Sequence, residues 1–366
     1  MNNWFVVSLL FLLPLVIFPY GSSYFEVPKV LLGQILIEAA FLYLFFRSGY
    51  KLKNIDKRFL FLVGIIAFIS LTHLFVTPTA TVFWGNQFRL QGTFLLWHLI
   101  IFSLLCSVSS SDKFSKWVPI LAFLGLFLSI FLLGLDPNGR AVGTLGEPNS
   151  LAAAALFIWP FIYFSLKGDR IKLLYKAILL TAALIIIIFS GSRSALLGFV
   201  LQLLFLILVS RLSVKISVVG VIVLLLASLT LPFLEDTGLF ENRSDVWRIS
   251  ALTAIKNPAL GFGFGNAEHY IRATAQEVNS NIQYQYVDSA HNVLLDYLIQ
   301  GGVPGLLALV VLIFLSVRNF VAQRRILEVT LLLGVFTVML FNPVSVVILL
   351  YFWWIIAQGF RPSNFS

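Results

Sequence analysis

Long apolar segments separated by short polar gaps recur from one end of the chain to the other. A helix needs about 20 mostly apolar residues, within a range of about 17 to 25, to cross the hydrocarbon core of a bilayer, so we predict about 12 transmembrane helices. They lie near residues 4–20, 28–46, 59–76, 93–110, 117–134, 151–166, 177–191, 195–210, 216–233, 291–316, 327–341 and 344–359. The predicted fold class is an all-α, polytopic membrane protein in which residues 1–366 form a single transmembrane domain.

The gap between the ninth and tenth predicted spans, residues 234–290, is much longer than the others. Connections longer than about 15 residues usually carry function, so we predict an outer loop subdomain here. Within it, SDVWRISALTAIKNP predicts a short surface helix that begins at Ser244 and ends before Asn257 and Pro258. A second short helix is predicted near residues 267–278.

The composition supports the membrane assignment and excludes a soluble enzyme. The chain is 59% hydrophobic and 11% charged, with a mean hydropathy of +0.96, whereas soluble domains have about 25% charged residues. The net charge of +9 does not indicate a nucleic-acid partner, because most basic residues lie in short gaps between apolar segments and lack interleaved aromatic residues. The lipid bilayer is the partner that this composition indicates.

The distribution of basic residues predicts the orientation of the chain. If the N-terminus is cytoplasmic, roughly two thirds of the Lys and Arg residues fall in inner gaps, as the positive-inside rule requires. Both termini are then cytoplasmic, and the N-terminal apolar segment is a retained span. The outer gaps are residues 77–92, 135–150, 190–194 and 234–290.

Arg193 interrupts a strongly apolar region between the seventh and eighth predicted spans. An arginine at membrane depth costs about 2.5 to 3.5 kcal/mol even on the most lenient scale. One interpretation is an interfacial anchor that extends toward water. The alternative is an anion ligand, because the small residues around it leave room for a phosphate and a guanidinium binds phosphate oxygens through two parallel hydrogen bonds.

Further arginines lie in the other outer gaps. Arg243 and Arg248 belong to the predicted surface helix, where they either pair with nearby acids on a solvated face or contact an anionic substrate. Their spacing of five residues places them on different faces, so we expect only one to point to any given site. The weaker candidates for substrate binding in the outer gaps are Arg89, Arg140 and Asn149.

His291 opens the tenth predicted span, close to Asp288. It is either a helix-start histidine bonded locally to Asp288 or a general base, since an unperturbed imidazole titrates near 6.5 and can accept a proton from a hydroxyl. The motif GFGFGN at 261–266 follows a helix stop and not a strand, so we interpret it as a turn and not as a dinucleotide-binding loop. No histidine has further ligands at zinc spacing, so we predict neither a metal nor a cofactor.

These residues suit the transfer of a group from a lipid-linked phosphate donor: arginines for the phosphate, a histidine for a hydroxyl and an apolar body for the lipid. The alternative from another class is a polysaccharide flippase or transporter without covalent chemistry. Transporters usually carry interrupted helices and polar groups near the bilayer midplane, whereas the polar groups of this chain cluster on one side.

Four segments of the chain resemble the O-antigen ligase and O-antigen polymerase superfamily of bacterial envelope glycosyltransferases. They are GRAVGTLGEPNSLAAAAL (139–156), SGSRSALLG (190–198), RSDVWRISALTAIKNPALGFGFGN (243–266) and DSAHNVLLDYLIQGGVPG (288–305). FEVPK (25–29) and FWGNQFRLQG (83–92) match more weakly. The order of the segments, their outer placement and the predicted topology together carry the resemblance.

The resemblance implies an inverting, metal-independent transfer of a glycan from a polyprenyl-diphosphate carrier, such as undecaprenyl diphosphate, in lipopolysaccharide or other polysaccharide biosynthesis. It implies a multi-pass protein of the bacterial inner membrane whose active site faces the periplasm or cell exterior. The diphosphate-binding arginines would be Arg193 and Arg243, with Arg248 as an additional candidate, and the essential histidine would be His291. The chain departs from the family pattern at Glu147. The acceptor hydroxyl, on a glycan, a lipid or a protein, stays open, as does the choice between ligase and polymerase.

Overall fold

The fold is described from a computed structural model of the chain. It describes residues 4–18, 23–48, 55–108, 115, 117–166, 170–234 and 243–361. Within these ranges the chain is helical apart from connecting segments, and the sole pairing of extended backbone is one isolated bridge between Leu135 and Ala141. The prediction of an all-α fold is confirmed.

The helices follow one another with short connections. The bounds are α1 Trp4–Val7, η1 Ser8–Leu12, η2 Leu13–Leu15, α2 Glu26–Ser48, α3 Lys57–Val76, α4 Ala80–Trp84, α5 Thr93–Ser107, α6 Trp117–Leu132, η4 Gly143–Leu145, α7 Pro148–Ser165, α8 Arg170–Ser190, α9 Arg193–Arg211, α10 Val214–Ser228, α11 Leu231–Leu234, α12 Arg243–Lys256, α13 Ala267–Glu277, η5 Asn281–Tyr284, α14 Val293–Ala322, α15 Ile326–Phe341 and α16 Val346–Gly359.

The described residues include seven helices that are long and apolar enough to cross a membrane, and the chain is a multi-pass membrane protein. Five shorter apolar segments, at Trp4–Leu15 and in α5, α6, α15 and α16, fall where further spans were predicted. Each predicted span therefore coincides with helical structure, but by length alone only seven qualify, and the total of about 12 stays a prediction. Helix α14, which corresponds to the tenth predicted span, is longer than predicted and has a kink at Gly302.

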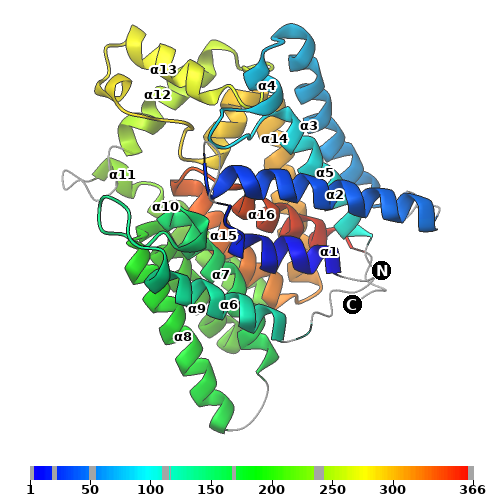
Figure 1. The fold of residues 1–366 in the computed structure, drawn as a ribbon, viewed down its shortest axis with the longest axis vertical. Coiled ribbons are helices and arrows are strands. Elements are labelled where there is room, and N and C mark those ends of the chain that lie inside the picture. Colours follow the sequence, from blue (N-terminus) through cyan, green and yellow to red (C-terminus); the bar gives the residue numbers. More distant parts are fainter. Residues whose placement is uncertain are drawn as a thin grey trace.

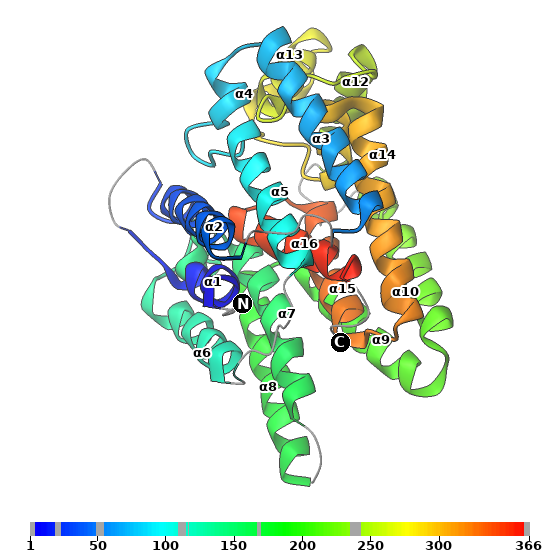
Figure 2. The same ribbon diagram turned by 90° about the vertical axis from the view of Figure 1, so that its right-hand side faces the viewer.

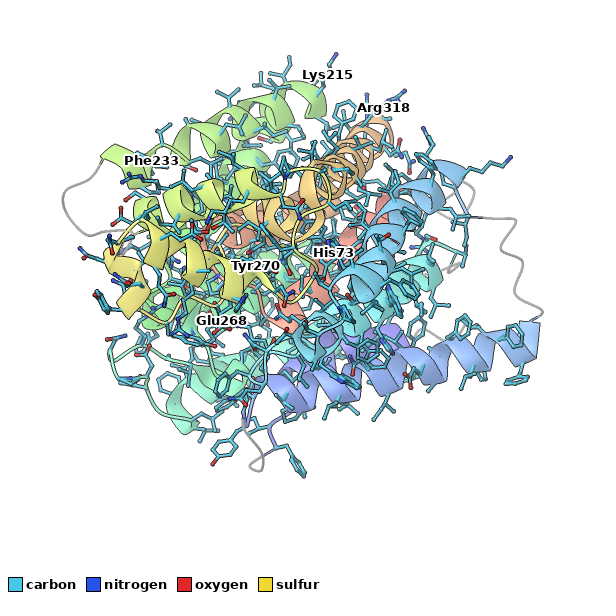
Figure 3. All side chains as sticks on the ribbon, turned by 90° about the horizontal axis from the view of Figure 1, so that it is seen from above. His73, Lys215, Phe233, Glu268, Tyr270 and Arg318 are labelled. Atoms are coloured by element: carbon cyan, nitrogen blue, oxygen red, sulfur yellow. The ribbon has the colours of Figure 1, made fainter. Side chains whose placement is uncertain are left out.

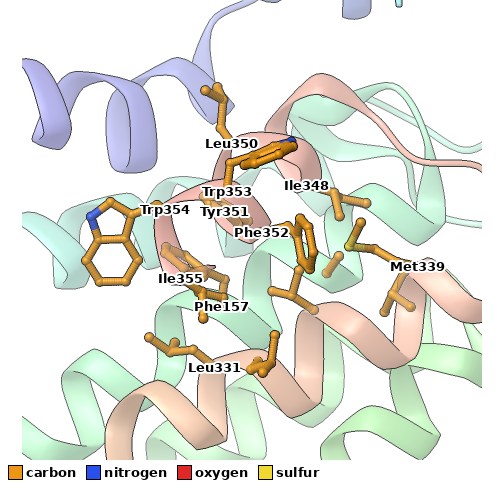
Figure 4. Packing of buried hydrophobic residues seen from close by; sticks show 14 of the residues in the cluster. Phe157, Leu331, Met339, Ile348, Leu350, Tyr351, Phe352, Trp353, Trp354 and Ile355 are labelled. Carbon is orange, nitrogen blue, oxygen red and sulfur yellow. The ribbon is translucent and has the colours of Figure 1, made fainter. Parts of the chain in front are cut away.

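Helix α16 is the centre of the bundle. It is buried along its whole length, packs against α5, α14, α15 and α7, and lies in the middle of the molecule in Figures 1 and 2. Tyr351 stacks on Phe157 of α7 with ring centroids 3.8 Å apart, among the other buried side chains in Figure 4. A helix that is apolar on every side must be surrounded by other helices or lipid, and here helices surround it.

The segment between α11 and α14 forms two helices, α12 and α13, as predicted, and they lie together at one end of the molecule in Figure 1. Both pack on α14, and they share a small apolar core that includes Val246, Ile271 and Ile299. The glycine-rich motif between them is a turn, as predicted, with Gly261, Gly263 and Gly265 at positive φ. The interpretation of residues 234–290 as a separate subdomain stays a prediction.

This glycine-rich turn is fixed against the kink of α14. The N–H groups of Phe262 and Gly263 donate to the carbonyls of Ile299 and Gln300, at 2.8 and 3.0 Å. These carbonyls lie next to the non-helical Gly302, so the turn provides the hydrogen bonds that the kink removes from the helix. His73 of α3, labelled in Figure 3, braces the same turn through a 3.2 Å contact between its Nε2 and the Gly261 carbonyl.

Gln202 of α9 joins three helices inside the apolar body. Its side chain is fully buried, accepts a hydrogen bond from Trp159 Nε1 at 2.8 Å and donates to the carbonyls of Leu156 and Thr330 at 3.0 and 2.8 Å. The close approach requires a glycine opposite, because a Cβ on Gly334 would lie 2.3 Å from the Gln202 Nε2. The Gln202 side-chain amide is therefore a buried polar group whose oxygen and nitrogen both have hydrogen-bond partners.

We predict that Gln202→Leu lowers the free energy of unfolding by about 1 to 2 kcal/mol, because it leaves the buried Trp159 N–H without its acceptor. The measurement is denaturant unfolding of the purified protein in detergent. Gln323→Leu is the matched control, because Gln323 is exposed after the end of α14. Equal stability of the two variants would contradict a stabilising role for Gln202.

Candidate functional site

The candidate site is organised by a break between two buried helices, at residues 342–345. Asn342, the first residue after α15, is buried. Its Nδ2 donates to the Ser194 hydroxyl at the start of α9 and to the Val338 carbonyl at 3.1 Å. Its Oδ1 accepts a hydrogen bond from Nη2 of Arg243, at 3.2 Å. One amide thus connects α15, α9 and the start of α12.

Arg243 also holds His291. Its Nη1 donates to Nδ1 of the imidazole, and a guanidinium carries N–H donors but no acceptor. Nδ1 therefore provides the lone pair, and a neutral His291 ring holds its proton on Nε2. This Nε2 lies 3.7 Å from Oδ1 of Asp288. The structure thus brings together two residues predicted from the sequence, Arg243 and His291.

The surroundings of His291 favour the neutral imidazole. Burial lowers its pKa below the ordinary value, and the charges of Arg243 and Arg89 lower it further, while Asp288 acts in the opposite direction. Burial alone would raise the pKa of Asp288, but its contacts with His291 and Arg89 outweigh burial and lower the pKa to about 2. At neutral pH the pair is therefore an uncharged imidazole beside an ionised carboxylate.

Arg89 is paired inside the site and does not point to open solvent. Its Nε donates to Asp288 Oδ2, and its Nη1 lies 3.9 Å from a carboxylate oxygen of Glu147 and 3.4 Å from the Val344 carbonyl. Burial by itself would lower the pKa of Arg89, but the surrounding carboxylates raise it, so the guanidinium stays charged. In this geometry Arg89 positions Asp288, which in turn contacts His291.

Two residues of the site have an uncommon backbone conformation. His291 has φ +54° and Leu90, next to Arg89, has φ +50°. Positive φ is unfavourable for residues with a Cβ, although histidine tolerates it better than leucine, and it costs about 1 to 3 kcal/mol where the surrounding structure imposes it. The contacts on either side of the Arg89–Asp288 ion pair hold both residues in this conformation.

Three helix N-termini meet around Asn342. The helices α9, α12 and α14 begin at Arg193, Arg243 and Val293, and the hydrogen bonds of Asn342, Arg243 and His291 connect them. A helix N-terminus carries about half a positive charge and unpaired N–H groups. These N-termini, together with Arg193 and Arg243 at the first positions of α9 and α12, make an environment suited to an anion.

The remaining predicted residues lie around this centre. Arg193 is exposed at the start of α9, next to Ser194. Arg248 is exposed on another face of α12 from the one that carries Arg243, as its spacing predicted. Arg140 and Asn149 lie together: the guanidinium donates to the Ser190 carbonyl at 2.8 Å and to the Asn149 side chain at 3.2 Å. These two residues brace the turn between α8 and α9.

Residues that sequence reasoning missed complete the site. Neither Asn342 nor Glu26 is among the candidates predicted from the sequence. The Glu26 carboxylate accepts hydrogen bonds from the Val346 N–H at 2.6 Å and the Gln91 side chain at 3.3 Å, while Gln91 also donates to the Val344 carbonyl at 2.6 Å. The signal available in the sequence was a polar residue next to a helix break between two apolar segments.

Two of the cavities near the site differ in chemical character. The first has a volume of about 490 Å³. It is lined by Ser23, Phe25, Glu26, Phe88, Arg89, Leu145, Gly146, Glu147, Tyr286 and Asp288. The second, of about 310 Å³, is a groove lined entirely by apolar side chains of α10, α14 and α15. It runs from Leu294, near His291, and Leu340, near Asn342, to Val317 and Val329.

No group of three or more His, Cys, Asp or Glu side chains could hold a metal ion within the described ranges. The prediction that no metal takes part stays a prediction.

Residues 177–310 match the family model described as O-antigen ligase. The match contains Arg193, Arg243, Arg248 and His291, and it ends before Asn342. It confirms the resemblance to the O-antigen ligase superfamily. No curated protein matches the chain.

Proposed function

We propose that this membrane protein is a glycosyltransferase, on the basis of the match of residues 177–310 to the O-antigen ligase family model. It would move a glycan from a polyprenyl-diphosphate carrier to an acceptor hydroxyl on the outer side of the bacterial inner membrane. The observation that carries the proposal is the contact between Arg243 and His291 at the meeting point of three helix N-termini. A group for the leaving diphosphate and a group for the attacking hydroxyl are adjacent there.

The donor has two chemically different parts, and the site offers a place for each. The diphosphate would contact Arg243 and Arg193, whose charges stabilise the negative charge that develops on the leaving group as a divalent cation does elsewhere. The polyprenyl tail would lie in the apolar groove between α10, α14 and α15, which begins at Leu294 and Leu340, beside the arginine site. The head and tail of one amphiphilic molecule would thus be bound side by side.

The contact between Arg243 and His291 adds a step to the proposed mechanism. While Arg243 donates to Nδ1 of His291, the imidazole lone pair is occupied and cannot accept a proton. A diphosphate competes for the guanidinium N–H groups and would release Nδ1. The acceptor hydroxyl then attacks the anomeric carbon and its proton passes to Nδ1, while the bond from that carbon to the diphosphate oxygen breaks. Asp288 would keep the Nε2–H oriented and stabilise the imidazolium.

We predict that Arg243→Lys lowers the transfer rate by about 30- to 1,000-fold. Arg243 uses two separate nitrogens for His291 and Asn342, and a lysine ammonium cannot reproduce that fork. The measurement is transfer from a purified lipid-linked donor by the protein in proteoliposomes. Arg272→Lys is the matched control, because Arg272 is exposed on α13. Full activity of Arg243→Lys would remove the diphosphate assignment.

We predict an acid limb in the pH–rate profile with a midpoint below 6.5, because burial lowers the pKa of His291 and only the neutral ring accepts a proton. The rate falls as pH drops through this pKa. Asp288→Asn should move the limb to lower pH, since the Asp288 charge raises the pKa of His291. His291→Gln should lose about 10²- to 10⁴-fold in rate and the limb itself. A limb that persists unchanged in His291→Gln would exclude His291 as the base.

In the proposed orientation, residues 243–291 lie on the outer side of the membrane. The connection between α9 and α10 lies on the cytoplasmic side. We expect cysteines at Gln276 and Lys215, both exposed, to react with a membrane-impermeant maleimide from opposite sides of the membrane. The background is Cys106→Ala, which removes the sole cysteine of the chain. Labelling of both positions in intact spheroplasts would refute the orientation.

A further inference from the structure

We propose that the 490 Å³ cavity beside Asp288 is a subsite for a neutral sugar ring of the acceptor. This inference rests on the proposed function and concerns a part of the molecule that is assigned neither to the diphosphate, at Arg193 and Arg243, nor to the polyprenyl tail. The volume lies within the range of about 300 to 1,000 Å³ found for small-molecule sites. The cavity is enclosed by the start of α2, the segment after α4, the turn before α7 and the segment before α14.

The chemistry of the lining suits a sugar. Phe88 and Tyr286 stand at 87° to each other, with ring centroids 6.4 Å apart, and both are partly exposed, at 43% and 59%. Aromatic faces of this kind pack against the apolar face of a pyranose ring. Glu147 and Asp288 provide carboxylate oxygens, which accept hydrogen bonds from hydroxyl groups. Aromatic rings and carboxylates thus occur together in the lining of one cavity.

The charges of the lining disfavour an anionic ligand. The cavity has one guanidinium, that of Arg89, and it is already matched by Asp288 and by Glu147. Lys29 does not add a free cation, because its ammonium is buried and donates to the carbonyls of Phe25 and Thr144, at 2.9 and 2.8 Å. A phosphate or uronate would meet carboxylates without an unpaired cation, whereas neutral hydroxyl groups would be bound by them.

The position of the cavity favours the acceptor over the donor. Leu294 and Leu340 of the apolar groove lie within three residues of His291 and Asn342 along the chain. Arg243 contacts His291, and His291 faces Asp288 in the lining of the cavity. An inverting displacement requires the leaving oxygen and the attacking oxygen on opposite sides of the anomeric carbon. If the lipid tail and diphosphate lie on the groove side, the acceptor approaches from the cavity side.

The test is a binding measurement that does not depend on turnover. Wild-type protein in lipid nanodiscs is mixed with glucose, galactose and N-acetylglucosamine, with glucuronic acid as the anionic comparison, and bound sugar is detected by saturation-transfer NMR. We expect signals from one or more neutral sugars and at most weak signals from glucuronic acid. Tyr286→Ala and Glu147→Gln should each weaken binding about 10- to 100-fold.

The controls separate this cavity from the rest of the molecule. Tyr284→Ala removes a ring that is 83% exposed and does not line the cavity, and Glu277→Gln removes an exposed carboxylate that pairs with Lys256. Both should bind sugar as wild type does, and so should Arg243→Lys. Size-exclusion profiles and thermal unfolding confirm that each variant is folded.

Each outcome supports or overturns the inference. Absence of neutral-sugar signals, equal signals from glucuronic acid, or unchanged binding in both cavity variants would overturn it. Loss of binding in Arg243→Lys would move the sugar to the donor side and overturn the assignment to the acceptor. Sugar binding in the cavity without any glycan transfer by the wild type would instead remove the proposed function and leave the cavity as a sugar site.

Discussion

The rest of the structure depends on one constraint: the chain must break between α15 and α16 while both helices are buried. Backbone N–H and C=O groups inside a membrane protein have no bulk water to bind, so side chains have to satisfy them. Gln91 and Arg89 donate to the Val344 carbonyl, and the Glu26 carboxylate accepts from the Val346 N–H. These hydrogen bonds bring the start of α2 and the segment between α4 and α5 to the break.

The same break sets the electrostatics of the candidate site. Arg89, held at Val344, fixes Asp288, and Asp288 faces one nitrogen of His291 while Arg243 occupies the other. A substitution at Arg89, Asp288 or Arg243 would therefore change the pKa of the His291 imidazole. This coupling explains why a histidine with a lowered pKa lies between an arginine and a carboxylate.

Sequence reasoning found the parts of the site that have a local signal. Arg193 interrupts an apolar run, Arg243 opens a short helix with a clear stop, and His291 stands at a helix start, so each differs from its neighbours in a way that the chain itself displays. Helix geometry also predicted that Arg243 and Arg248 lie on different faces of one helix. Arg89 was found too, but only as a substrate-binding candidate, because its partners Asp288 and Glu147 are far from it in sequence and no spacing connects them.

The sequence by itself determined the all-helical fold and the positions of the apolar segments, because burial in lipid leaves a strong periodic and compositional signal. It also singled out the arginine and histidine candidates, whose chemistry stays a prediction. The tertiary structure alone decided that Asn342 joins three helices, that Glu26 satisfies the backbone before α16, and that α16 is the centre of the bundle. The physical reason is that a polar residue at a helix break has many partners available along the chain. Only the packing of the buried helices determines which partners lie within hydrogen-bond distance.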